Sequence, residues 1–259
     1  MSGSILVAQI TDTHLLTYRE DRLRGVPPWS SLQAVLAVVA QARPHLLLLT
    51  GDLADAGEAA AYHHLVDLVQ PLGIPTYWLA GNHDDSALMA RLLNCPPLYP
   101  HKSLAIGGWQ LLLLNSVLPD SRFGEGVLAL ETLHWLEAEL KAARGHPTLL
   151  ALHHPPIPVG VDWLDQIKLT NAPLLLELLA QQENVRLVLF GHIHATYQYQ
   201  QGAIHFYGCP SSCTQVLLPN ALTPEAAQPG FRLLRLYPDG SHQTEVRRVR
   251  ICCSCCVQD

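Results

Sequence analysis

Charged residues are scarce in this sequence, and basic ones are the scarcer kind: 16 lysines and arginines stand against 22 aspartates and glutamates in 259 residues. The formal net charge of -6 argues against a general nucleic-acid or membrane surface. No apolar run approaches the roughly 18 residues of a membrane span. The first apolar run, Ile5 to Ala8, is too short for a signal peptide and follows no basic region. We therefore expect a cytoplasmic protein that spans no membrane and binds no nucleic acid.

Cysteine is also sparse until the end of the chain. Four of the seven cysteines crowd the last eight residues: Cys252, Cys253, Cys255 and Cys256. An odd total argues against a disulfide framework. These four residues could bind a soft metal or respond to oxidation, but no second ligand pair accompanies them. We therefore expect one domain over residues 1–249, followed by a disordered tail over residues 250–259.

The main feature that is present is a set of short apolar runs that end in polar residues. The run from Leu46 to Thr50 is too short for a helix and suits a strand buried on both faces. Gly51 then allows a sharp turn, so Asp52 follows the carboxyl end of this strand. Four further runs end in the same way: Ile5 to Ile10 before Asp12 and His14, Thr76 to Ala80 before Asn82, His83 and Asp84, Thr148 to Leu152 before His153 and His154, and Val185 to Phe190 before His192 and His194.

Segments with helical periodicity separate these five runs, and alternating strands and helices predict parallel pairing. The expected helices begin at Ser30 or Ser31 and run to Arg43, and then cover Glu58 to Val69, Asp85 or Ser86 to Leu93, Leu130 to Ala143, and Asn171 to Gln181. We expect the five strands to share one parallel or mixed sheet, with their polar ends at one edge.

After His194 the pattern changes to short alternating strands, among them Gln215 to Leu218. Together with Leu104 to Asn115, these could form a second sheet. We expect an α/β fold, a four-layer α/β/β/α sandwich of two mixed sheets flanked by helices. The loop from Pro155 to Thr170 is long, and both a lid over the site and an irregular surface loop remain open for it.

The polar residues at the strand ends form a set of metal ligands without a thiolate: Asp12, His14, Asp52, Asn82, His153, His192 and His194. Nitrogen and oxygen donors in this mixture suit iron, manganese, zinc or cobalt. Seven ligands are too many for one ion and suit two divalent or trivalent ions. A shared carboxylate would hold such ions about 3.5–4 Å apart, and Asp52, in the middle of the sheet, is best placed to bridge them.

Charge arithmetic indicates the substrate class. Two divalent ions bring +4, and Asp12 with Asp52 brings -2, so the site would carry +2 inside a protein of net charge -6. Such a site attracts anions. A metal-bound water with its pKa lowered to about 7 could supply hydroxide for attack on phosphorus. No fixed cationic side chain is evident beside these motifs for the extra charge of a monoester, which favours diesters.

The five motifs in this order resemble the signature of the calcineurin-like metallophosphoesterases, over about residues 5 to 248. More narrowly, the stretches from Gly208 to Gln215 and from Pro229 to Arg232 resemble bacterial class III cyclic nucleotide phosphodiesterases, which open cyclic AMP. The resemblance implies the metallophosphoesterase fold and a small phosphoester substrate, with cyclic AMP opened to 5'-AMP. A phosphomonoesterase, a glycerophosphodiesterase or a nuclease on the same site remains an alternative. A noncatalytic scaffold would be expected to lack some of these residues.

The resemblance also implies roles for individual residues. One ion would be held by Asp12, His14, Asp52 and His194, and the other by Asp52, Asn82, His153 and His192. His83 would be the catalytic residue, as proton donor to the leaving alkoxide or as stabiliser of charge on the phosphoryl oxygens. Asp55, Asp84 and His154 would orient these side chains through hydrogen bonds. A homodimer is possible.

Overall fold

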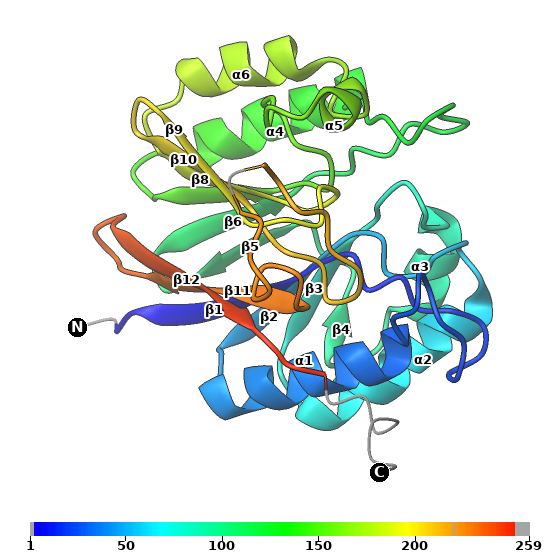
Figure 1. Cartoon of the computed structure of the whole chain (residues 1–259). Helices are drawn as coiled ribbons and strands as arrows, with labels where there is room; N and C mark the ends of the chain where they lie inside the picture. Colours follow the sequence, from blue (N-terminus) through cyan, green and yellow to red (C-terminus); the bar gives the residue numbers. More distant parts are fainter. Residues whose placement is uncertain (1–2, 220, 252–259) are drawn as a thin grey trace.

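The computed structural model describes residues 3–219 and 221–251, and in this part of the chain two six-stranded sheets pack face to face between two layers of helices (Figure 1). The predicted four-layer α/β/β/α sandwich of two mixed sheets is confirmed. Cys252, Cys253, Cys255 and Cys256 lie outside the described residues, so the disordered tail and the domain limits stay predictions. In the described part of the chain, no helix is long and apolar enough to cross a membrane.

The first sheet has the strand order β12-β11-β1-β2-β3-β4. Its central strands β1 to β4 run parallel to one another, and β11 and β12 add an antiparallel hairpin beside β1. The strands are β1 (Ile5–Ile10), β2 (Leu46–Thr50), β3 (Thr76–Leu79), β4 (Leu98–Tyr99), β11 (Gly230–Leu236) and β12 (His242–Arg248).

The second sheet has the order β5-β6-β7-β8-β10-β9. Strands β6, β7, β8 and β10 are parallel, and β5 and β9 are antiparallel edge strands. The strands are β5 (Ser103–Ile106), β6 (Trp109–Leu113), β7 (Thr148–Ala151), β8 (Val185–Phe190), β9 (Tyr197–Gln201) and β10 (Ile204–Gly208).

Each sheet is covered by its own helices, as Figure 1 shows. The helices α1 (Pro28–Ala42), α2 (Ala59–Val69) and α3 (Ser86–Leu92) pack on the first sheet, and a 3-10 turn (Gln70–Leu72) follows α2. The helices α4 (Leu130–Ala142), α5 (Asp162–Gln166) and α6 (Ala172–Ala180) pack on the second.

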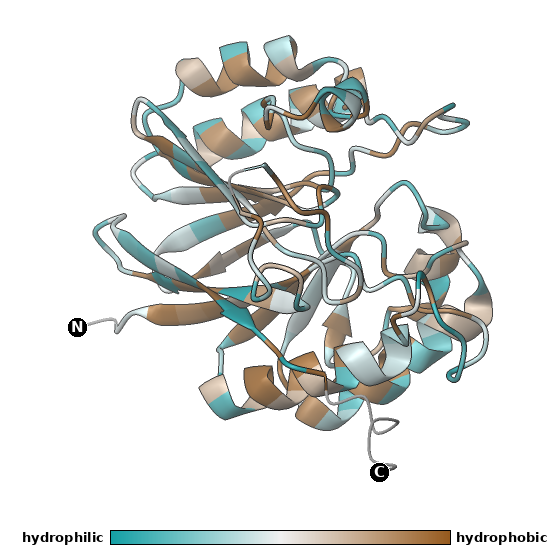
Figure 2. Cartoon of the chain, in the orientation of Figure 1, coloured by the Kyte–Doolittle hydropathy of each residue, from teal (hydrophilic) through white to brown (hydrophobic). Residues whose placement is uncertain are grey.

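The leucines of β2 show why these strands are apolar at every position. Leu47 and Leu49 pack under the helices, whereas Leu46 and Leu48 pack between the two sheets. Successive side chains of a strand point to opposite faces, so a strand covered on both faces needs an unbroken apolar run. Figure 2 shows the contrast between the largely hydrophobic β1 and the largely hydrophilic edge strand β12.

The expected arrangement of the five motif-bearing strands was wrong. They do not share one sheet, because β1, β2 and β3 lie in the first sheet and β7 and β8 in the second. The β5–β6 hairpin begins the second sheet, and β11 and β12 occupy the free edge of β1. Periodicity reports that a strand is buried but not which strand is its neighbour. The polar ends still converge, because the parallel strands of both sheets end on the same side of the molecule (Figure 1).

Two local predictions were also wrong. Residues 215–218 form no strand, because the amide of Val216 donates to the His194 carbonyl and the Gln215 side chain donates to Ser211. Helix α1 begins at Pro28, where proline suits the first turn. Ser31, a predicted cap, instead donates its hydroxyl to the Ser212 carbonyl at 2.5 Å.

Candidate metal centre

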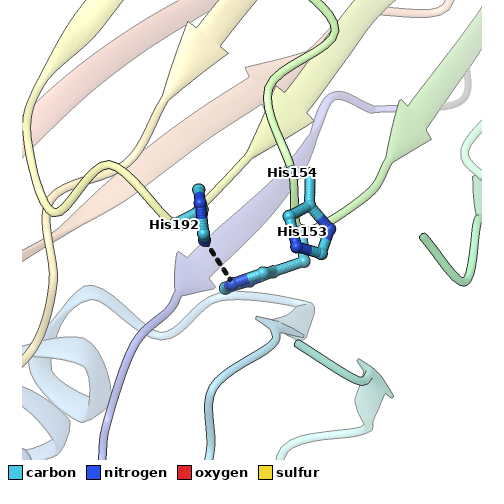
Figure 3. Close-up of side chains that lie close together, drawn as sticks. All are labelled: His153, His154 and His192. Carbon is cyan, nitrogen blue, oxygen red and sulfur yellow. Dashed lines mark hydrogen bonds between the residues drawn. The ribbon is translucent and has the colours of Figure 1, made fainter. Parts of the chain in front are cut away.

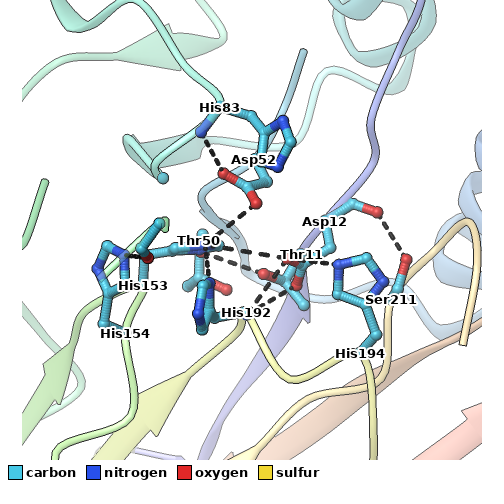
Figure 4. Close-up of polar contacts among 12 residues, drawn as sticks. Thr11, Asp12, Thr50, Asp52, His83, His153, His154, His192, His194 and Ser211 are labelled. Carbon is cyan, nitrogen blue, oxygen red and sulfur yellow. Dashed lines mark hydrogen bonds and ion pairs between the residues drawn. The ribbon is translucent and has the colours of Figure 1, made fainter. Parts of the chain in front are cut away.

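The structure brings the seven predicted ligands together at the carboxyl ends of β1, β2, β3, β7 and β8. Donor atoms of Asp12, His14, Asp52 and His194 lie within 4.8 Å of one another. These four residues are the set that the family resemblance assigns to one ion. His194 Nε2 lies 3.2 Å from Asp12 Oδ1 (Figure 4). It also lies 3.1 Å from His14 Nε2.

A second group lies on the other side of Asp52. His153 Nε2 is 3.3 Å from Asp52 Oδ2 and 3.2 Å from His192 Nδ1, the contact drawn in Figure 3. Asp52 Oδ2 is also 3.8 Å from His14 Nε2. The Asp52 carboxylate therefore lies between the two groups, where the sequence places a bridging ligand.

His154 lies beside His153 and His192, and its ring could be taken for a further donor (Figure 3). Both of its nitrogens are already engaged, however. Nδ1 is 2.8 Å from the Ser116 hydroxyl, and Nε2 is 3.0 Å from the Gly124 carbonyl. These contacts fit the supporting role expected for His154.

Buried polar atoms without partners test whether these residues fit metal ions. Asn82 Oδ1 and His192 Nε2 are buried and have no hydrogen-bond partner among the described residues. A buried polar atom left unpaired costs about 1–3 kcal/mol. Both atoms belong to predicted ligands of the same ion, so coordination would satisfy them together. The donor set therefore fits the transition metals expected from the sequence.

Hydrogen bonds fix the orientation of three of the histidines. His14 Nδ1 is 3.0 Å from Asp55 Oδ1, His153 Nδ1 is 2.9 Å from the Thr50 carbonyl, and His194 Nδ1 is 2.9 Å from the Thr214 carbonyl. Each contact leaves Nε2 facing the centre, as in many protein metal sites. Asp55 was expected in this role, whereas Thr50 and Thr214 act through backbone oxygens, a role that was predicted for neither.

The backbone around the centre is strained. Five predicted ligands have positive φ angles: Asp12 (52°), His14 (44°), Asp52 (50°), His192 (67°) and His194 (49°). Residues other than glycine avoid this left-handed region, at a cost of about 1–3 kcal/mol each where the structure imposes it. Strain gathered at one site is typical of functional residues.

Two glycines allow the strand ends of the two sheets to meet. A Cβ at Gly191 would lie 2.1 Å from Thr11 Oγ1 and 2.9 Å from Asp12 Oδ2. A Cβ at Gly51 would lie 2.4 Å from His153 Nδ1. Any side chain at either position would push the strand ends of the two sheets apart.

Asp84 holds the backbone on which the ligands lie. Its carboxylate accepts hydrogen bonds from the amides of Leu53 (3.1 Å), Ala54 (3.0 Å) and Gly81 (2.9 Å). It thereby ties the turn that carries Asp52 to the turn that carries Asn82. Burial, with the nearby Asp52 charge, raises the pKa of Asp84 to about 6, although these amides oppose the shift.

One supporting residue was missed. The Ser211 hydroxyl donates to the Asp12 carbonyl at 2.7 Å, and the amide of Ser212 donates to the Thr11 carbonyl at 3.1 Å (Figure 4). Ser211 follows β10, which is parallel to β8 and ends on the same side. The rule that polar residues after apolar strands gather at one edge could have found it.

His83 lies at the rim of the centre and is exposed. Its ring meets the His14 ring edge-on with centroids 4.9 Å apart, and its Nδ1 lies 2.6 Å from the Asp55 carbonyl. Its backbone amide donates to Asp52 Oδ1 at 2.9 Å. Nε2 has no hydrogen-bond partner in the described part of the chain, which leaves this nitrogen available to a substrate.

The buried acids and histidines form charged pairs. Burial works to raise the pKa of Asp52, but the His153 charge and hydrogen bond outweigh it, so the pKa lies well below its usual value. Burial works to lower the pKa of His153, but the Asp52 carboxylate raises it to about 9. His192 remains neutral, because burial and the His153 charge lower its pKa to about 3.

The centre opens into a cleft of about 170 Å³. Besides the metal-donor residues, its walls contain Arg24, Phe123, Trp163 and Ile167. Trp163 and Ile167 belong to the loop from Pro155 to Thr170, for which a lid over the site was one of two open interpretations, whereas Arg24 and Phe123 were not predicted to line the site. Arg24 is exposed, and the turn at Arg24 and Gly25 carries no sequence signal that would place a cation at this cleft. A larger cavity, about 850 Å³, lies elsewhere, among the α4–β7, α6–β8 and β11–β12 turns, and holds none of the predicted ligands.

The chain belongs to the calcineurin-like phosphoesterase family, whose model matches residues 5–196. It is thus a metallophosphoesterase, a hydrolase of a family that uses divalent metal ions. It is 42% identical over 250 residues to a 3',5'-cyclic-nucleotide phosphodiesterase of Nostoc sp., with 95% of this chain and 92% of the relative covered. It is 39% identical to the 3',5'-cyclic adenosine monophosphate phosphodiesterase CpdA of Escherichia coli, with 95% and 90% covered.

Solved structures show the same fold at low identity. A dimetal phosphatase from Danio rerio matches with a TM-score of 0.73 at 15% identity, covering 95% of this chain and 96% of the other. GAP50, an anchor in the inner membrane complex of Plasmodium, matches with a TM-score of 0.66 at 12% identity, covering 96% and 89%. The fold therefore does not decide function, which depends on the site.

The charged pairs predict that metal binding is linked to protons. His153 holds a proton below about pH 9, and an ion must displace it. The affinity of the metal-free protein for Mn²⁺ should therefore rise with pH, by up to about tenfold per unit from this group. Calorimetry in buffers of different ionisation enthalpy would measure the released protons. An affinity that does not change between pH 6 and 8, with no proton release, would contradict this model.

Proposed function

We propose that this protein is a dinuclear metal-dependent phosphodiesterase that hydrolyses 3',5'-cyclic AMP to 5'-AMP. The main support is the pair of donor groups that share Asp52, at the base of an open cleft. The substrate follows from the two relatives at 42% and 39% identity, which carry the names of cyclic nucleotide phosphodiesterases.

The ligand sets follow the two donor groups. Asp12, His14, Asp52 and His194 would hold one ion, and Asp52, Asn82, His153 and His192 the other. Divalent ions at these donors supply Lewis acidity, which activates water as a nucleophile and neutralises charge on the phosphoryl oxygens. Iron, manganese, zinc and cobalt all suit these nitrogen and oxygen donors.

His83 is the catalytic residue in this proposal. The Asp55 carbonyl accepts from Nδ1 and leaves Nε2 without a partner, so His83 with both ring nitrogens protonated would donate from Nε2 to the leaving 3'-oxygen or to a phosphoryl oxygen. Asp55 further orients His14, Asp84 holds the turns around Asp52 and Asn82, and His154 braces the loop at Gly124. These three contribute by position and do not touch the substrate.

A phosphomonoesterase is the second candidate, because of Arg24. Its guanidinium lines the cleft and could match the extra charge of a monoester. The presence of every predicted donor argues against a noncatalytic scaffold. A glycerophosphodiesterase and a nuclease share the same centre, but 16 basic residues against 22 acidic ones offer no track for a nucleic-acid backbone. The cytoplasmic location and the homodimer stay predictions.

We expect diesters to be hydrolysed faster than monoesters, with cyclic AMP among the substrates. Purified enzyme would be assayed with cyclic AMP, bis-p-nitrophenyl phosphate and p-nitrophenyl phosphate. A higher kcat/KM on the p-nitrophenyl monoester than on its bis ester would overturn the diesterase proposal. Arg24→Gln should then reveal whether the guanidinium supports that monoesterase activity.

The shared carboxylate predicts how metal content responds to substitution. Fully loaded wild type should carry up to two transition-metal ions per chain. Asp52→Asn should weaken the binding of both ions, because Asp52 lies between the two donor groups. Asp12→Asn should weaken the binding of only one ion. Elemental analysis would give the stoichiometry. A single tightly held ion in fully loaded wild type is incompatible with the dinuclear model.

Substitution of His83 separates catalysis from metal binding. His83→Ala should lower kcat on cyclic AMP by about 10²- to 10⁴-fold, the usual contribution of a placed proton donor, and keep both ions. The loss should be much smaller with a p-nitrophenolate leaving group if His83 is the acid, and similar if it stabilises phosphoryl charge. His63→Ala, an exposed histidine of α2, is the matched control. Full activity, or loss of metal, would show that His83 is misassigned.

A further inference from the structure

The residues that line the cleft are of two chemical kinds. The metal donors, His83, Arg24 and Thr214 are polar, whereas Leu23, Phe123, Trp163, Ile167 and Val216, here called the apolar half, are not. Phe123 is 69% exposed and Trp163 is 52% exposed, although both are large aromatic residues. Single exposed apolar residues need no explanation, but two aromatic residues on one cleft favour a ligand with an apolar face.

The position of Phe123 is fixed close to the metal centre. The Glu125 carboxylate accepts a hydrogen bond from the Phe123 amide at 2.9 Å, and His154 Nε2 contacts the Gly124 carbonyl at 3.0 Å. A Cβ at Gly124 would lie 3.0 Å from the side-chain nitrogen Nδ2 of Asn82. Phe123 is therefore adjacent in the chain, at about 3.8 Å between Cα atoms, to a residue whose backbone lies beside the Asn82 side chain.

Trp163 is positioned by the burial of the next residue, Leu164. Leu164 in α5 is fully buried in the core of the second sheet. The Asp165 carboxylate accepts hydrogen bonds from the amides of Val159 (2.7 Å) and Gly160 (3.1 Å), which fixes the loop that leads into α5. The loop from Pro155 to Thr170 thus contains an anchored helix that places one indole at the cleft.

We infer that Phe123 and Trp163 bind the purine base of the substrate and set the preference for nucleotides over other diesters. This inference rests on the proposed phosphodiesterase function. In a 3',5'-cyclic nucleotide one ribose separates the phosphorus from the base, so a phosphate at the metal donors brings the base to the apolar half. A planar base stacks well on aromatic side chains. The cleft thus matches the charged and the apolar part of one molecule.

The test compares two diesters that differ only in the base: cyclic AMP and ribose 3',5'-cyclic phosphate. Phe123→Leu and Trp163→Leu should each lower kcat/KM on cyclic AMP by about 5- to 150-fold, the usual effect of losing one base-stacking residue. The loss on the base-free diester should stay under about threefold, since it has no base to stack. Trp163→Phe, which keeps an aromatic face, should retain most of the activity on cyclic AMP.

Tyr199→Leu is the matched control, because Tyr199 is 46% exposed on the edge strand β9 and does not line the cleft. Equal losses on the two diesters, or no loss on cyclic AMP, would refute base recognition. Binding of 5'-AMP and ribose 5-phosphate, measured by calorimetry, gives a readout independent of turnover. If wild type fails to hydrolyse cyclic AMP, the proposed function fails. In that case base recognition still stands if the leucine variants weaken the binding of 5'-AMP but not that of ribose 5-phosphate. It is refuted if they do not.

Discussion

The close approach of two sheets at their carboxyl ends is the constraint on which the rest of this structure depends. Gly191 lies so near Thr11 and Asp12 that no side chain fits between them. The amide of His192 donates to both Asp12 carboxylate oxygens at 3.1–3.2 Å, so a residue of the second sheet is bonded directly to a residue of the first. The inter-sheet core of Leu46, Leu48 and their partners holds the layers at the distance at which this contact forms.

This approach concentrates energetic costs that the protein alone does not relieve. Stability is lowered by the buried carboxylates and by the left-handed backbone at five residues. It is lowered further by the buried atoms Asn82 Oδ1 and His192 Nε2, which have no hydrogen-bond partner among the described residues. Metal coordination would offset several of these costs at once, because it satisfies Asn82 and His192 and replaces the proton on His153. Binding energy of this kind adds to folding stability, since an ion that binds only the folded chain favours it. The proposed centre is therefore both the reactive part of the molecule and a link between its two halves.

The sequence predicts that the candidate ligands gather at one side of the molecule, but it does not predict the arrangement of the sheets. Strand ends carry Asp12, Asp52 and His153 because short apolar runs and the polar residues after them are adjacent in sequence. Strand pairing depends on contacts between distant segments, so no local sequence pattern shows that β3 and β7 belong to different sheets. The backbone oxygens of Thr50 and Thr214 orient ligands and would do so whatever side chain these two residues carried. A pattern of residue types therefore cannot reveal this role.

The metal donors and the other cleft residues also differ in how strongly the sheets determine their positions. The donors lie on turns whose conformation is dictated by the strands, whereas Arg24, Phe123 and Trp163 lie on loops or on a short helix within a loop. Figure 1 shows the loops before α1 and α4 on the same side of the molecule. Loops tolerate changes of sequence and length that strands do not, so one dinuclear scaffold can serve many phosphoesters. Chemistry would then follow from the sheets and substrate choice from the loops. A family signature, which marks the sheet-borne motifs, therefore identifies the reaction and leaves the substrate to be found in the structure.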